Sequence, residues 1–134
     1  MATILVVEDD NQIRNMLRIA LERKGYDVIE AENGVKAMSL QRKTPADLVI
    51  TDIIMPEKDG IDTMKELKAE FPKVKIIAMS GGKRGGPENY LRLAEMFNAD
   101  KTIAKPFHLE EVLTDADRMT ENQFMLKFWN DPAI

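Results

Sequence analysis

The chain has 134 residues, a formal charge of −4, no cysteine and a single histidine. This length fits one domain and leaves little room for a second. The negative charge argues against a nucleic-acid-binding surface, and the lack of cysteine excludes disulfides, thiolate zinc sites and cysteine nucleophiles. The apolar run at the N-terminus is too short for a secretory signal or a membrane span, so we expect a cytoplasmic protein.

The first part of the chain alternates strand-length apolar runs with segments of helical period. A strand is expected at Thr3–Glu8, followed by a helix whose apolar residues recur every three or four positions and which ends at Gly25. A second strand at Tyr26–Glu30 leads through a turn to a helix at Val35–Arg42. A third strand, Asp47–Asp52, is one of two that stop at acidic residues.

The same alternation continues to the end of the domain. A third helix is expected at Ile61–Phe71, a fourth strand at Val74–Met79 and a fourth helix at Glu88–Phe97. The fifth strand and helix follow at Lys101–Ala104 and His108–Met119. Strict alternation with short connections indicates an α/β fold with a parallel sheet, right-handed crossovers and helices on both faces.

We expect residues 1–119 to form this domain and residues 120–134 to form a C-terminal extension. Thr120-Glu121-Asn122-Gln123 matches a capping box and precedes the apolar segment Phe124–Trp129. The extension is either a sixth short helix or a continuation of the fifth. We expect it to pack on the body, and the alternative is a surface for a partner or a second copy.

Acidic residues follow the first and third strands. In parallel sheets the carboxyl ends of the strands form the ligand crevice, so Glu8, Asp9 and Asp52 converge if the two strands are neighbours. Carboxyl groups so near to one another resist ionising together unless a cation joins them. The cluster therefore predicts a site for a hard divalent ion. Asp9 could instead cap the first helix, a role that we assign to Asp10 or Asn11.

Motifs at the ends of four different strands occur together and in a recognisable order. They are Ile4–Asp10, Asp47–Pro56 with Asp59-Gly60, Ile76–Ser80 and Lys105–Phe107. Together they resemble the receiver domain of bacterial two-component response regulators, from about Thr3 to Met119. The resemblance implies a flavodoxin-like, doubly wound, five-stranded parallel sheet of order 2-1-3-4-5 with five helices.

The resemblance also implies how the acidic residues act. Asp52 is the phosphoacceptor, whose carboxylate takes the phosphoryl group as a mixed anhydride. Asp9, Asp52 and the backbone carbonyl of Ile54 bind Mg²⁺, and Glu8 acts through water. Mg²⁺ suits such a site because it takes few carboxylates, keeps waters and binds phosphate oxygens.

Lys105 and Ser80 complete the set of reactive residues by the same resemblance. Lys105 pairs with the Asp52 carboxylate and then with the phosphoryl oxygens, and a cis bond before Pro106 aims it inward. The Ser80 hydroxyl donates to a phosphoryl oxygen. Taken alone, Lys105 would more often be a solvated surface lysine, and Ser80 would be about equally often a polar residue that caps the glycine loop.

Two positions depart from the family pattern. Thr102 stands where the family often has tyrosine or phenylalanine, so an aromatic switch is in doubt and output is expected from the Gly81–Gly86 loop and the fourth helix. Ile54 is apolar where its side chain would overlook the acceptor. We expect it to restrict a hydrolytic water and to lengthen the phosphorylated lifetime.

These residues favour a stand-alone receiver in two-component signal transduction. It would take a phosphoryl group from a sensor histidine kinase or a histidine phosphotransferase and change its affinity for a downstream protein target. It would catalyse only its own phosphorylation and dephosphorylation, bind neither DNA nor membrane, and exist as a monomer or weak dimer.

Two other functional classes fit the sequence less well. An aspartate-nucleophile phosphohydrolase of haloacid-dehalogenase type needs a second acid two residues after the nucleophile, where Ile54 stands, and a cap domain. A flavodoxin-type binding module needs a phosphate-binding loop after the first strand, where Glu8-Asp9-Asp10 would repel a phosphate without metal.

Overall fold

In the computed structural model, residues 2–53, 60–81, 92, 94–95 and 97–129 are described, with side chains as far as Thr120. Five strands form one sheet in the order β2-β1-β3-β4-β5, and every neighbouring pair is parallel. The strands are β1 (Thr3–Val7), β2 (Asp27–Ala31), β3 (Leu48–Asp52), β4 (Lys75–Ser80) and β5 (Lys101–Ala104). The α/β, flavodoxin-like architecture and its strand order are confirmed.

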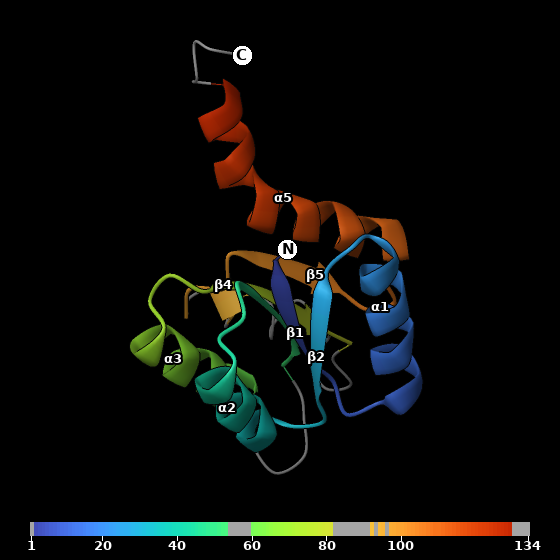
Figure 1. Cartoon of the computed structure of the whole chain (residues 1–134). Helices are drawn as coiled ribbons and strands as arrows, with labels where there is room; N and C mark the ends of the chain where they lie inside the picture. Colours follow the sequence, from blue (N-terminus) through green and yellow to red (C-terminus); the bar gives the residue numbers. More distant parts are fainter. Residues whose placement is uncertain (1, 54–59, 82–91, 93, 96, 130–134) are drawn as a thin grey trace.

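Helices cover both faces of this sheet (Figure 1). They are α1 (Asn11–Arg23), α2 (Gly34–Lys43), α3 (Gly60–Glu70) and α5 (Leu109–Trp129). α2 and α3 lie together on one face, and α1 and α5 on the other. Of the predicted fourth helix, Arg92, Ala94 and Glu95 are helical and much of the remainder lies outside the described residues.

The interior position of β1, between β2 and β3, explains why Ile4–Val7 are all apolar. Leu5 and Val7 point into one core and Ile4 and Val6 into the other, so both faces of the strand are buried. The first core is shared with Ala37, Met38, Met64 and Leu67 of α2 and α3, and the second with Leu17, Leu21, Val112 and Ala116 of α1 and α5. Truncating one such leucine to alanine costs about 2–5 kcal/mol.

Local signals set the helix ends near their predicted positions. The Asp10 carboxylate caps α1 and accepts hydrogen bonds from the amides of Gln12 at 2.9 Å and Ile13 at 3.2 Å. After α1, Gly25 has a φ of 96°, which glycine adopts without a steric penalty. Because Asp10 serves as the cap, the Asp9 side chain is left for another role.

The fifth helix is longer than the predicted His108–Met119. α5 continues without a break to Trp129, so the first part of the extension is a continuation of that helix and not a separate one. Packing of residues 120–134 on the body stays a prediction. Within the described ranges, no helix combines the length and apolar character that crossing a membrane requires.

Candidate functional site

Three carboxylates meet where β1 and β3 end. The two strands are adjacent with Val7 opposite Thr51, so Glu8 and Asp9 follow β1 at the level where Asp52 ends β3. One carboxylate oxygen from each of Glu8, Asp9 and Asp52 lies within 4.8 Å of the other two. Glu8 is fully buried, Asp52 is 6% exposed and Asp9 is exposed. The sequence placed these acids on separate segments, and the sheet brings them together at one rim.

Lys105 reaches the same rim from β5. Its Nζ lies 3.0 Å from Oδ2 of Asp52 and also donates a hydrogen bond to Oε1 of Glu8. The bond between Lys105 and Pro106 is cis, as the resemblance implied. The lysine is therefore an inward-facing counter-charge and not a solvated surface residue.

The charges at this rim do not balance. Burial raises the pKa of Glu8 to about 7, against the lowering effect of its hydrogen bond from Lys105. Burial lowers the pKa of Lys105, but the Glu8 and Asp52 carboxylates outweigh it and raise this pKa overall. Among the described residues, the Lys105 ammonium pairs with two of the three clustered carboxylates, and such a group of hard oxygen donors fits a divalent cation such as Mg²⁺.

Ser80 ends β4, the strand next to β3. Its side chain is fully buried, and its hydroxyl has no hydrogen-bond partner in the described structure. The Ser80 carbonyl accepts a hydrogen bond of 2.8 Å from the Lys105 amide, which ties the ends of β4 and β5 together. A buried hydroxyl without a partner is a donor available to an oxyanion bound nearby.

The backbone after Asp52 is held by a contact that sequence reasoning missed. The Gly60 amide donates to the Ile53 carbonyl at 2.8 Å, and a Cβ at Gly60 would lie 2.4 Å from the Asp52 carbonyl oxygen. Only glycine permits this approach. Gly60 had been singled out only as part of the Asp59-Gly60 motif, and the signal for a contact was its place at the start of a helix, where glycine is a weak helix former.

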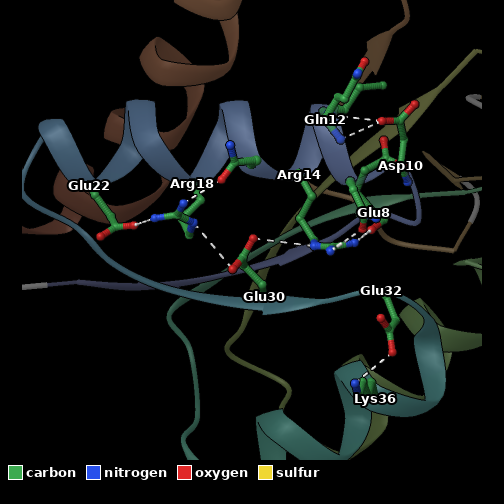
Figure 2. A network of polar contacts seen from close by, with 12 residues as sticks. Glu8, Asp10, Gln12, Arg14, Arg18, Glu22, Glu30, Glu32 and Lys36 are labelled. Atoms are coloured by element: carbon green, nitrogen blue, oxygen red, sulfur yellow. Dashed lines mark hydrogen bonds and ion pairs between the residues drawn. The ribbon is translucent and has the colours of Figure 1, made fainter.

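Arg14 of α1 is a second residue that sequence reasoning did not single out. Its guanidinium donates to the Glu8 carbonyl at 2.8 Å, so it contacts the segment that carries two of the acids (Figure 2). An arginine on a polar helix face gives no local sign of such a contact.

Two predicted features fall partly or wholly outside the described residues. The Ile54 carbonyl, predicted as a metal ligand, lies there, as does the Gly81–Gly86 loop except for Gly81. Thr102 stands where the family often has an aromatic residue, and its hydroxyl lies 3.5 Å from a carboxylate oxygen of Glu95.

Comparison with known proteins identifies the family. The chain matches the response regulator receiver domain over residues 4–117. It is 34% identical to the response regulator receiver protein CpdR of Brucella abortus, over 89% of this chain and 97% of that protein. It is 38% identical to the chemotaxis protein CheY of Halobacterium salinarum, over 82% of this chain and 89% of that protein.

A solved structure agrees with this assignment. A response regulator receiver domain protein from Clostridium thermocellum superimposes with a TM-score of 0.83 at 25% identity, over 94% of this chain and 99% of that one. Both the sequence match and the strand order extend over most of the chain. The chain therefore belongs to the response regulator receiver domains of two-component signal transduction.

Proposed function

We propose that this receiver domain accepts a phosphoryl group on Asp52 from a phosphohistidine, carried by a sensor histidine kinase or a histidine phosphotransferase. The observation that carries the proposal is the environment of Asp52. This carboxylate is 6% exposed, pairs with Lys105 at 3.0 Å and lies within 4.8 Å of oxygens of two other acids. Receiver domains are not classical enzymes, and we propose that this one catalyses only its own phosphorylation and dephosphorylation.

Mg²⁺ is the proposed cofactor. Asp9 and Asp52 would bind it with the Ile54 carbonyl, and Glu8 would act through water. The negative excess of the three acids over Lys105 supports a divalent ion. When bound, Mg²⁺ neutralises charge on the acids and on the phosphoryl oxygens, which is most of what phosphoryl transfer requires.

The transfer breaks the P–N bond of the phosphohistidine and forms a P–O bond to a carboxylate oxygen of Asp52. The product is a mixed anhydride, and the departing imidazole takes up a proton. Lys105 is placed to follow the negative charge from the carboxylate to the phosphoryl oxygens, because its ammonium is a mobile point charge. The buried Ser80 hydroxyl, which has no partner in the part of the chain that the structure describes, would donate to one of those oxygens.

Output would follow from the added charge at the rim. A phosphoryl group on Asp52 would draw Lys105, which follows β5, and Ser80, which ends β4, toward its oxygens. We propose that this changes the affinity for a downstream protein target. The domain would act as a monomer or weak dimer, without direct contact to DNA.

Acetyl phosphate treatment with and without Mg²⁺, followed by intact mass measurement, tests the proposal. Wild type should gain one phosphoryl group only with Mg²⁺, and Asp52→Asn should gain none. Asp62→Asn, at an exposed aspartate of α3, is the control and should behave as wild type. Phosphorylation of Asp52→Asn would contradict the proposal. Steady phosphate release from small phosphomonoesters would favour a phosphohydrolase.

A further inference from the structure

The guanidinium of Arg14 uses all three of its nitrogens (Figure 2). Nη1 donates to the Glu8 carbonyl oxygen at 2.8 Å, and Nη2 donates to Oδ1 of Asn11 at 2.6 Å. Nε lies 3.5 Å from Oε1 of Glu30 on β2. The Arg14 side chain is only 16% exposed, so these contacts are largely shielded from solvent at the N-terminal turn of α1.

Two of the Arg14 contacts are made to residues on either side of Asp9, a predicted metal ligand. Asp9 is exposed and stands between Glu8, whose carbonyl Arg14 holds, and Asn11, whose side chain Arg14 holds. The Glu8 amide donates to the Ala31 carbonyl at 3.0 Å, so the peptide groups on both sides of Glu8 are bonded. The path of the chain through Asp9 is therefore held by β2 on one side, and by Arg14 together with the Asp10 cap of α1 on the other.

A neighbouring arginine makes similar contacts without touching this loop. Arg18 lies one turn further along α1, with Nε 3.5 Å from the other carboxylate oxygen of Glu30. Its remaining nitrogens contact Glu22 and Asn15, both on α1 (Figure 2). Arg18 therefore shares the charge, the helix and the Glu30 partner of Arg14, and differs in having no contact with Glu8.

We infer that Arg14 is a positioning residue of the metal site, holding the Glu8–Asp10 loop in the geometry that binds the ion. Without a cation, the crowded acids repel one another and favour a loop that moves away from Asp52. If the loop is already ordered before Mg²⁺ binds, the free energy of ordering it does not reduce the affinity for the ion. The inference rests on the proposed function, since it assumes that Mg²⁺ binds at these acids.

Whether Mg²⁺ affinity rises or falls when Arg14 is replaced separates a positioning role from a purely electrostatic one. Removing a positive charge near an anionic site should, by Coulomb attraction alone, strengthen Mg²⁺ binding. Loss of positioning should weaken it. Lysine keeps the charge but presents one ammonium in place of the planar fork, so it cannot bond Glu8 and Asn11 together as Arg14 does.

Calorimetric titration of the unphosphorylated domain with Mg²⁺ tests the inference. We expect Arg14→Met to weaken binding about tenfold, as is usual when a group that orients a metal ligand is lost. Arg14→Lys should also bind more weakly than wild type, whereas Arg18→Met should stay within about twofold. If Arg14→Met does not fold, as judged by urea unfolding, Arg14→Lys decides the matter.

The Mg²⁺ dependence of phosphorylation by acetyl phosphate gives a second readout. Arg14→Met should raise the half-saturating Mg²⁺ concentration and leave the rate at saturating Mg²⁺ unchanged, which a general loss of structure would not do. Tighter or unchanged Mg²⁺ binding in Arg14→Met, or wild-type affinity in Arg14→Lys, would overturn the inference. Wild type that binds Mg²⁺ but accepts no phosphoryl group would overturn the proposed function alone; wild type that binds no Mg²⁺ would overturn both.

Discussion

Lys105 and Asp52 form an ion pair of 3.0 Å across strand β4, which lies between their own strands. The lysine also contacts the fully buried Glu8, so one side chain from the edge of the sheet joins acids at the ends of β1 and β3. Because this lysine is the counter-charge of both acids, we expect it to contribute both to stability and to the proposed phosphoryl transfer.

Replacing Lys105 by methionine should therefore have opposite effects on metal binding and on phosphoryl transfer. The acids lose their counter-charge, so Mg²⁺ affinity should rise while the rate of phosphorylation by acetyl phosphate falls. Unpairing these carboxylates should also lower the free energy of unfolding without Mg²⁺ at pH 8, by about 2 kcal/mol. Calorimetry, mass measurement and urea unfolding check the three effects. Lys36→Met, which removes an exposed ion pair with Glu32, is the control; equal changes in both variants would contradict the prediction.

The pKa of Glu8 predicts how stability depends on pH without metal. Burial raises this pKa from 4.5 to about 7. Between these two pH values, the folded state therefore holds a proton on Glu8 that the unfolded chain has released. The Glu8 contribution to stability is thus fully present below about pH 4.5 and is lost as the pH rises through about 7. Mg²⁺ affinity should increase over the same range, since the ion competes with that proton.

Urea unfolding at several pH values between 5 and 8, without Mg²⁺, measures this contribution. Glu8→Gln should remove much of the fall in stability toward high pH. Glu111→Gln, at an exposed position of α5, should keep the wild-type slope. A Glu8→Gln variant with an unchanged slope would show that another group titrates.

Two glycines near the site should tolerate alanine very differently. A Cβ at Gly60 would lie 2.4 Å from the Asp52 carbonyl oxygen, so the acceptor backbone must shift. A Cβ at Gly81 would lie 3.5 Å from Cβ of Lys105, an ordinary van der Waals contact. We expect Gly60→Ala to lose about 2 kcal/mol of stability and to be phosphorylated more slowly, with Gly81→Ala close to wild type in stability. Similar urea midpoints for the two variants would contradict this reading of the contacts.

Ser80→Ala should separate stability from function. The Ser80 hydroxyl is buried and has no hydrogen-bond partner among the described residues, so its removal should leave the unphosphorylated domain as stable as wild type or more so. Phosphorylation by acetyl phosphate should become slower, because the hydroxyl is the proposed donor to a phosphoryl oxygen. Urea unfolding and intact mass measurement test both parts, with the exposed Ser39→Ala as the control. A clear loss of stability would show that the hydroxyl has a partner in solution.

The elements were predictable because their signals are local. Each predicted strand ends within one residue of the observed one, since an apolar run bounded by turn residues identifies a buried strand wherever it lies in the sheet. Asp10 and Gly25 mark the ends of α1 through backbone geometry that involves a few neighbouring residues. The end of the fifth helix was less clear, because the capping-box residues at 120–123 fit both a new helix and the observed continuation of α5.

The strand order came from the family resemblance, and the site depends on that order. Two strand-end acids meet only if β1 and β3 are neighbours, which their separate sequences do not state. The contact of Arg14 with Glu30 joins α1 to β2, whose adjacency is created by the crossover, whereas those of Arg14 with Glu8 and of Gly60 with Asp52 each span one loop.

By itself, then, the sequence determined which segments are strands and helices and which reactive side chains the chain carries. Hydrophobic period and backbone conformation depend on near neighbours, and that information is complete in each segment. Only the tertiary structure decided that Lys105 faces Asp52, that burial raises the pKa of Glu8 and that Arg14 pairs with Glu30. These properties depend on distance and solvent exclusion between residues remote in the chain, which exist only once the sheet has formed.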